Sequence, residues 1–310
     1  MKKLLRKPTA YLSAVVVGLS SMLVFAVPSV HAASVLWDGE GGDNNFSTAA
    51  NWSGDIVPSD GDDLVFRNDT ISQSEIYTND LTNFAPRSFS FQKGVATNYY
   101  SITIAGNDIT ITDGIYTEIP AVLDLNLTLN GDQTFTNAAN TTQGSLTIGN
   151  QNATRDMNIG ISNLTIHDDS SCAVVRIDSN VTGSGQINVT GSYNATVLSK
   201  SNSSYTGSIN VGAGSYLEAQ NAQSLGTTGT GTTVASGGSI GFASASGYTD
   251  NSYAEPLNIS GTGGQYTGAI VATIPIIGTG CKGGVPDVNF TITLTGTITL
   301  QTDITASTWL

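Results

Sequence analysis

Short apolar pairs recur at a nearly constant spacing in the stretch 185–242, which reads GQINVTGSYNATVLSKSNSSYTGSINVGAGSYLEAQNAQSLGTTGTGTTVASGGSIGF. Ile187 precedes Ile209 by 22 residues, and Leu217 precedes Ile240 by 23. Around these positions apolar and polar residues alternate between boundaries of Gly, Ser, Asn and Thr, which is typical of half-buried β-strands. A fixed spacing in the range of about 20–50 residues is typical of solenoids. A unit of this length accommodates three strands of about 5 residues with their turns, so the spacing predicts one coil of a parallel β-helix.

The composition favours an all-β chain over a helical one. Charged residues make up 11% of the 310 residues, and 35 residues are Gly. Ser, Thr and Asn fill many of the remaining positions, which suits strands that present hydroxyls and amides to water and that are joined by tight turns. No amphipathic stretch of helical length is present. The net charge of −13 argues against a nucleic-acid partner, because nucleic acids are bound by basic patches.

The stretch 185–242 also resembles a known family, the autotransporter-associated β-strand repeat, which is also called the passenger-associated transport repeat. The resemblance implies a right-handed parallel β-helix on a secreted or surface-displayed bacterial protein that is exported by dedicated machinery. It covers about a fifth of the chain and implies an architecture without naming a ligand. The matching positions are Tyr205-Thr206-Gly207, Ile209, Val211, Gly214, Leu217 and Leu225-Gly226.

Residues 1–33 have the three-part form of a Sec signal peptide. The basic start MKKLLRK is followed by an apolar run over 11–27, and Val30-His31-Ala32 provides an A-x-A-like cleavage site. We expect cleavage near Ala32 or Ala33. The apolar run also approaches the ~17–20 residues that can cross a bilayer, so an uncleaved N-terminal anchor is the alternative. Both interpretations place the rest of the chain outside the cytoplasm.

Residues 34–66 are predicted to cap the first coil. The segment contains Trp37 and Trp52 among many Gly, Asp and Asn residues, and its first regular strand is expected at 63–66. It resembles the opening segment of autotransporter-type surface proteins, with Phe46 where relatives often carry Trp. Because the first coil of a solenoid has an open end, large aromatic side chains in a loop can cover it. Stacking on carbohydrate is the alternative role for the two tryptophans.

The β-solenoid is predicted to extend over 64–310, with the repeat at 185–242 as one unit of it. Leu125 and Ile148 are again 23 residues apart, and the segment 265–270 (QYTGAI) echoes 204–209 (SYTGSI). The segment 278–285 is expected to be a flexible insertion, and 289–304 (NFTITLTGTITLQTDI) has the most regular alternation. No sorting motif or polar capping repeat precedes Leu310, so the sequence favours a fragment of a longer polypeptide.

Cys172 and Cys281 are expected to remain unpaired. They lie 109 residues apart, which corresponds to four or five coils. Because stacked strands are ~4.8 Å apart, the two residues would be about 20 Å apart along the axis. A disulfide requires Cα atoms within about 7 Å.

No catalytic, cofactor or metal site is predicted. His167–Ser171 (HDDSS) contains the residue types of a catalytic triad, but triads are assembled from distant segments, and we interpret this one as a solvated turn. After removal of the signal peptide one His and two distant Cys remain, and these do not form a zinc site. The acidic clusters have the character of turns and do not match the EF-hand pattern, although a weak Ca²⁺ site at the first or second of them is an alternative. These clusters are Asp38/Glu40/Asp43, Asp60/Asp62/Asp63 and Asp168/Asp169.

A polysaccharide-active β-helix enzyme would need carboxylates and cations on one face of consecutive coils. The cations near the acidic clusters that could serve this role are His167, Arg155, Arg176 and Lys200. Arg155 and Arg176 are 21 residues apart, about one coil, and are therefore expected to stack. This is the one indication of a groove.

The sequence favours a secreted or surface-displayed, non-catalytic β-solenoid that acts as an adhesin or as a structural spacer. Its expected partners are glycans or proteins of host or bacterial surfaces. The alternatives are a polysaccharide lyase or hydrolase, and a passive stalk for a domain beyond Leu310. Stacked carboxylates with a basic partner in a groove would favour the enzyme.

Overall fold

The computed structural model describes residues 33–71, 73–95, 99–139, 145–170, 173–192, 195–243, 250–263, 268–273, 291–301 and 306–308. The chain divides into two compact units, Met1–His31 and Ala32–Leu310, and the described residues lie in the second. The expected signal sequence up to Ala32, both cysteines and the expected insertion at 278–285 lie outside the described residues.

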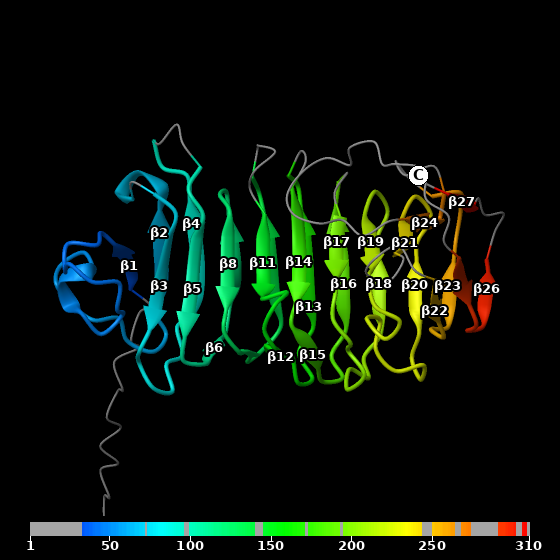
Figure 1. Ribbon diagram of the computed structural model, residues 1–310, viewed down its shortest axis with the longest axis horizontal. Coiled ribbons are helices and arrows are strands. Elements are labelled where there is room, and N and C mark those ends of the chain that lie inside the picture. Colours follow the sequence, from blue (N-terminus) through cyan, green and yellow to red (C-terminus); the bar gives the residue numbers. More distant parts are fainter. Residues whose placement is uncertain are drawn as a thin grey trace, which may run out of the picture. The chain divides into compact units, whose positions relative to one another are not determined.

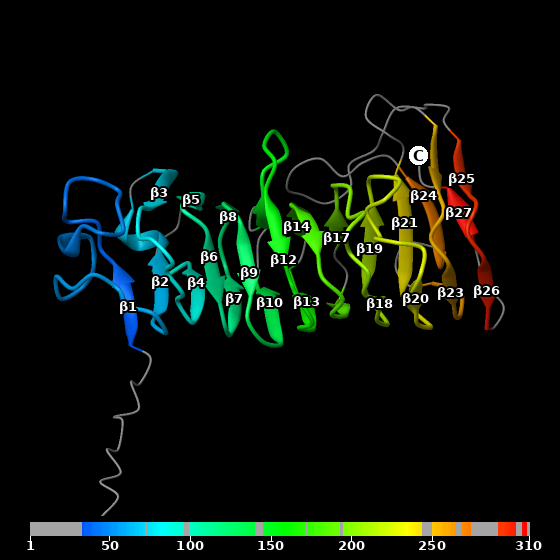
Figure 2. The same ribbon diagram turned by 90° about the horizontal axis from the view of Figure 1, so that it is seen from below.

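The unit Ala32–Leu310 is a parallel β-helix. Every pairing between its named strands is parallel, and strands of the same sheet come from successive coils (Figures 1 and 2). Two long sheets, here called sheet A and sheet B, have 11 and 10 strands; sheet C has four, and a further sheet has two. Two one-turn 3₁₀ helices, η1 (Ala49–Asn51) and η2 (Asn68–Thr70), lie in the first turns of the chain.

The strands of each sheet follow one another in chain order. Sheet A contains β1 (Ser34–Trp37), β2 (Asp63–Arg67), β4 (Ser88–Gln92), β7 (Gly114–Thr117), β10 (Gln133–Asn137), β13 (Leu164–Asp168), β16 (Ile187–Gly191), β18 (Ile209–Val211), β20 (Thr232–Val234), β23 (Leu257–Ile259) and β26 (Ile298–Leu300). Sheet B contains β3 (Glu75–Asn79), β5 (Ile102–Gly106), β8 (Ala121–Asp124), β11 (Leu146–Gly149), β14 (Val174–Asp178), β17 (Ala195–Leu198), β19 (Tyr216–Ala219), β21 (Ser239–Ala243), β24 (Ile270–Thr273) and β27 (Ala306–Thr308). Sheet C contains β6 (Ile109–Ile111), β9 (Leu127–Leu129), β12 (Asp156–Asn158) and β15 (Asn180–Thr182), and the two-stranded sheet contains β22 (Asn251–Tyr253) and β25 (Ile292–Leu294).

The predicted register is confirmed within the stretch 185–242. Ile187 lies opposite Ile209 in sheet A, and Leu217 lies opposite Ile240 in sheet B. All four side chains are buried. A shift of the pairing by one residue would turn the apolar face of a strand to water and is therefore disfavoured. The apolar alternation therefore fixes which residues of successive coils pair.

One register prediction outside this stretch is wrong, and two other sequence patterns do not correspond to single sheets. Ile148 lies opposite Leu123 rather than Leu125, because Leu125 occupies the corner between β8 and β9. The echo of 204–209 in 265–270 does not mark equivalent positions, since Ile209 belongs to sheet A and Ile270 to sheet B. The stretch 289–304 contains two short strands, β25 and β26, in two different sheets.

The core lies inside the coil and is formed by alternate residues of each strand. In the middle of sheet A, four such side chains from successive coils are at most 1% exposed: Phe135, Ile166, Val189 and Val211. The residues between them point away from the core and are mostly Thr and Asn. Sheet A therefore has an apolar inner face and a polar outer face.

An aromatic cluster closes the N-terminal end of the core. The first strand among the described residues is β1, which pairs with β2, so the coil already includes Ser34–Trp37 and does not begin at 63–66. Trp52 lies across the other edge of β1, where it forms an antiparallel bridge with Trp37. Its indole Nε1 donates to the carbonyl of Phe46 at 2.9 Å, and the centroids of the two tryptophan rings are 4.9 Å apart. The cap also includes Phe66 and Tyr77, which lie 5.9 Å and 4.6 Å from Trp37 between ring centroids.

Three of the positions that carry the repeat resemblance, Tyr205, Gly207 and Gly226, meet at one corner of the coil. The hydroxyl of buried Tyr205 donates to the carbonyl oxygens of Gly185, at 3.0 Å, and Ser208, at 2.7 Å. A Cβ added at Gly207 would collide with the Gly185 carbonyl and lie 2.6 Å from the Tyr205 hydroxyl. Gly226 packs against the same tyrosine in a left-handed conformation, at φ +99°. The motif thus consists of one aromatic ring and the glycines that make room for it.

We expect Gly207→Ala to lower the free energy of unfolding by about 1–3 kcal/mol, the usual cost of overpacking a tight site. Gly229→Ala is the matched control, because the nearest atom to its added Cβ, Thr227 Oγ1, is 3.9 Å away. Urea unfolding followed by circular dichroism measures both. Equal stability of the two variants would contradict the close approach at Tyr205.

Candidate functional site: the outer faces of the two long sheets

The outer face of sheet A carries three parallel rows of polar side chains, which we call the polar grid. The rows arise because residues two apart in a strand point to the same face, and the register then aligns them from coil to coil. The first row contains Asp132, Asn163, Gln186 and Ser208; the second contains Thr134, Thr165, Asn188 and Asn210; the third contains Thr136, His167 and Thr190. The second row continues through Thr233, Asn258 and Thr299.

Hydrogen bonds along the coil axis hold the grid in place. Asn163 Nδ2 donates to Asp132 Oδ2 at 3.2 Å, and Gln186 Nε2 donates to Ser208 Oγ at 3.1 Å. In the second row, Asn210 Nδ2 donates to Asn188 Oδ1 at 3.2 Å. These contacts fix rotamers that would be free on an isolated strand. The grid is therefore a pre-formed array of donors and acceptors at the strand spacing of about 4.8 Å.

His167 belongs to this grid. The prediction that His167–Ser171 is a solvated turn is therefore wrong for its first two residues. His167 and Asp168 are the last two residues of β13. The imidazole Nδ1 lies 3.0 Å from Thr190 Oγ1, and Nε2 lies 2.8 Å from Asp169 Oδ2. Ser170 contacts Asp168 through its backbone N–H, and its hydroxyl accepts from the N–H of Ala173. The described residues of this segment thus do not place a serine hydroxyl on the imidazole.

Asp168 points into the coil, at the corner where sheet A ends. It is 2% exposed, and its Oδ2 has no hydrogen-bond partner among the described residues. Burial raises the pKa of this carboxyl to about 7, against the lowering effect of hydrogen bonds from Ser170. The two preceding coils have neutral residues, Thr117 and Asn137, at the position of Asp168. Each of the three side chains accepts a hydrogen bond from the backbone N–H of the residue two positions later in the chain: Ile119, Ala139 and Ser170.

We expect Asp168→Asn to stabilise the protein at pH 8 by about 2–4 kcal/mol, because the folded state raises this pKa from about 4 to about 7. The folded state then binds the proton more tightly, so the wild type loses stability as pH rises through this window. Below pH 4 the difference should disappear. Unfolding in urea across pH 4–8 measures it, and Asp169→Asn, at a side chain 54% exposed, is the control. A difference independent of pH would contradict the assignment.

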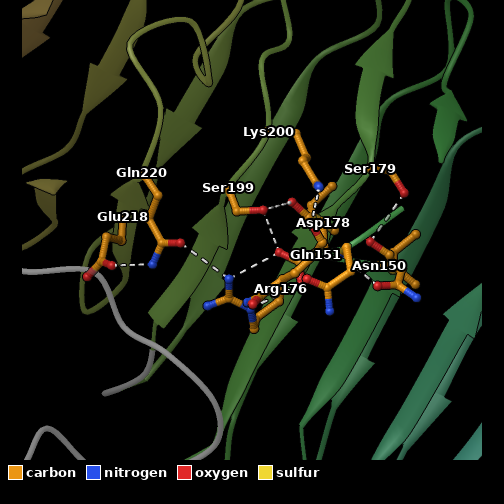
Figure 3. A network of polar contacts seen from close by, with 12 residues as sticks. Asn150, Gln151, Arg176, Asp178, Ser179, Ser199, Lys200, Glu218 and Gln220 are labelled. Atoms are coloured by element: carbon orange, nitrogen blue, oxygen red, sulfur yellow. Dashed lines mark hydrogen bonds and ion pairs between the residues drawn. The ribbon is translucent and has the colours of Figure 1, made fainter. Parts of the chain in front are cut away.

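The outer face of sheet B carries a buried polar network that spans β14, β17 and β19 (Figure 3). Arg176 donates to both carboxylate oxygens of Asp178, at 3.3 Å through Nε and 3.1 Å through Nη2. The same Nη2 donates to Gln220 Oε1 at 3.2 Å, and Gln220 Nε2 donates to Glu218 Oε1 at 2.7 Å. The hydroxyl of Ser199 donates to Asp178. The side chains of Arg176 and Asp178 are 5% and 3% exposed.

Apolar side chains surround this network on the outside of the coil. Val174, Ala195, Val197 and Tyr216 form a second buried cluster, separate from the core inside the coil. Glu218 is fully buried beside it and accepts from the Tyr216 hydroxyl at 3.2 Å. Arg176 and Asp178 lie on β14 and Glu218 lies two coils further on, on β19, so the two carboxylates and the arginine share one face of sheet B. All three are buried, which closes them to a polymeric substrate.

The predicted stacking of Arg155 with Arg176 is wrong. Arg155 immediately precedes β12 of sheet C, and its Nε donates to Asp124 Oδ1 at 2.7 Å. Arg176 instead lies opposite Thr147 and Val197 in sheet B. Lys200 donates from Nζ to the carbonyl of Gln151 at 2.7 Å (Figure 3). Arg155 therefore lies beside sheet C and Arg176 in sheet B.

The acidic residues near the N-terminus hydrogen-bond within their own loops and to neighbouring coils. Asp43 accepts from the N–H of Asn45 at 3.0 Å, from Thr48 and from Asn51, and these hydrogen bonds lower its pKa. Asp62 accepts from the N–H groups of Ala33 and Ser59, Asp60 accepts from Ala85, and Asp63 pairs with Arg87. Across the described part of the chain, no group of three or more His, Cys, Asp or Glu residues is arranged to hold a metal ion.

The structure does not present the two tryptophans to a ligand, since Trp37 and Trp52 are 2% and 0% exposed. The exposed aromatic side chain beside the grid is Tyr116 of β7, which is 37% exposed and lies opposite Thr136. Sequence reasoning did not single out Tyr116, Asp178 or Glu218. The alternation in Gly114–Thr117 is a signal that could have placed Tyr116 on the outer face.

Comparisons of the chain with family models, curated proteins and solved structures find no match. Neither helix in the described part of the chain is long and apolar enough to cross a membrane.

Proposed function

We propose that the chain is a secreted or surface-displayed bacterial β-solenoid of the autotransporter-passenger type, which acts without catalysis as an adhesin or a structural spacer. The observation that carries the proposal is the continuous polar outer face of sheet A, whose second row runs through seven strands from Thr134 to Thr299. The amino-terminal segment 1–33 would direct the chain to the Sec route.

Two physical properties support an extracellular contact role. The first is rigidity: the strands of successive coils are hydrogen-bonded to one another in sheet A, so the outer face of this sheet keeps a fixed geometry over many residues. The second is the density of uncharged hydrogen-bonding groups on that surface. Surfaces of this kind recognise polar partners such as glycans and surface proteins of host or bacterial cells.

Binding of the purified, fluorescently labelled chain to host and bacterial cells tests the adhesin role. Saturable binding that unlabelled chain displaces would support it, and indifference to every cell type would favour the spacer. Amino-terminal sequencing of the exported protein tests the route, with cleavage expected near Ala32 or Ala33. A cytoplasmic chain that keeps Met1 would contradict export.

The buried network of sheet B favours a second candidate, a polysaccharide-active enzyme. Asp178 and Glu218 lie on β14 and β19 with Arg176 between them in the hydrogen-bond chain, which is the combination a lyase or hydrolase groove would use. Their burial counts against it, because a substrate must reach its carboxylates. Release of unsaturated or reducing sugars from polygalacturonate would support the enzyme, and absence of any product would leave the adhesin or spacer.

A further inference from the structure

We propose that the polar grid, together with Tyr116, binds an uncharged glycan chain laid along the coil axis. The inference rests on the proposed adhesin role and specifies its site and ligand class. The grid extends over four consecutive strands of sheet A, β10, β13, β16 and β18, and Tyr116 stands on the strand before them. Such a strip has room for several sugar units in a row.

The charge of the grid selects an uncharged ligand. Asp132 and His167 are its only ionisable side chains, and the second row contains none. The whole chain carries a net charge of −13, so an anionic polymer would be repelled at long range with few cations near the grid to offset the repulsion. Uronic-acid polymers, sulfated glycans and nucleic acids are therefore disfavoured.

The repeat of the grid suits a polymer with a similar repeat. Successive strands are about 4.8 Å apart, which is close to the length of one hexose unit in an extended β-linked chain. Each step offers hydroxyl or amide groups that both donate and accept, as sugar hydroxyls require. Thr134 and Thr165 are β-branched and have few rotamers, and Asn188 is held by Asn210. Little side-chain freedom remains to be lost on binding.

Tyr116 supplies the apolar contact that sugar rings need. Its hydroxyl donates to Glu118 Oε1 at 2.9 Å, which fixes the ring beside the third row. The C–H face of a pyranose can then pack on the exposed ring face. Among the described residues of strands β7 to β23 in sheet A, Tyr116 is the one exposed large hydrophobic side chain. A protein partner would instead require a wider apolar centre.

The test measures binding of the purified full chain to phosphoric-acid-swollen cellulose and to β-mannan by depletion from solution, with polygalacturonate as the anionic counterpart. Binding to at least one neutral polymer and none to polygalacturonate is expected. The double variant Thr134→Val/Thr165→Val removes two hydroxyls and keeps the side-chain shape. It should weaken binding by about five-fold for each hydroxyl, and Tyr116→Ala should weaken it by about ten-fold.

The matched control is Thr110→Val/Thr128→Val. These two threonines also lie opposite each other on neighbouring strands, but in sheet C, so the control should bind like the wild type. Failure of the chain to bind either neutral polymer, or equal binding by the grid variants and the control, would overturn the inference. If cells are bound but neutral glycans are not, the grid inference fails while the adhesin role stands. Self-association that the grid variants abolish would instead identify a second copy as the occupant and overturn it too.

Discussion

Replacing Trp52 by alanine is expected to lower the free energy of unfolding by about 3–5 kcal/mol, the usual cost of truncating a buried tryptophan. The indole is fully buried and covers the free edge of β1. Its loss opens a cavity against Trp37 and Phe46, removes the edge-on ring contacts with both and leaves the Phe46 carbonyl without its donor. Each coil of a solenoid packs only against its neighbours. Removing the cap from the first coil therefore also exposes the inner side chains of that coil to water.

Urea unfolding monitored by tryptophan fluorescence and far-UV circular dichroism measures this effect. Tyr116→Ala serves as the control, since it truncates an aromatic side chain that is 37% exposed on the same sheet and should change stability by less than about 1 kcal/mol. A Trp52→Ala protein as stable as this control would show that the aromatic cluster does not close the core.

Replacing Arg176 by methionine is expected to cost about 3–5 kcal/mol, because it leaves the buried Asp178 carboxylate without its bidentate partner. The cost arises from the unpaired charge and not from the arginine itself. The double variant Arg176→Met/Asp178→Leu should therefore recover most of the loss. Chemical denaturation of the two variants and the wild type at pH 7 gives the comparison.

Arg155→Met is the control for this pair. Arg155 and its partner Asp124 are 34% and 19% exposed, and water can solvate the remaining carboxylate, so we expect a loss of about 1 kcal/mol or less. If Arg176→Met/Asp178→Leu is as unstable as Arg176→Met, the loss does not arise from the unpaired Asp178 carboxylate, and the prediction is wrong.

The apolar alternation made the fold predictable where it coincides with a single strand. Ile187, Ile209, Leu217 and Ile240 were assigned correct partners because each lies within one strand and one face. Leu125 was misassigned because period-two alternation continues through the corner between β8 and β9, where side chains still point inward. Local sequence does not distinguish a straight strand from two short ones that meet at a corner.

The polar sites were less predictable, because they depend on which coil lies beside which. Arg176 and Glu218 occupy outward positions of their strands, where alternation predicts exposure, yet they are buried beside the second apolar cluster. Asp168 is preceded by a histidine and followed by polar residues, which is typical of a turn, but β13 extends to Asp168 and its alternation places Asp168 on the same inner face as Leu164 and Ile166. The polar grid likewise requires the alignment of several strands.

The order of the strands also has a consequence for how the molecule assembles. Within sheets A and B each strand pairs only with the strands one coil before and one coil after it, so the sequence separation of its contacts does not grow as coils are added. Folding can therefore advance as a front, in which each completed coil templates the next, and its rate per coil is independent of total length. The ring contacts around Trp37 and Trp52 stabilise the first coils, so unfolding that starts from the N-terminal end must first break this cluster.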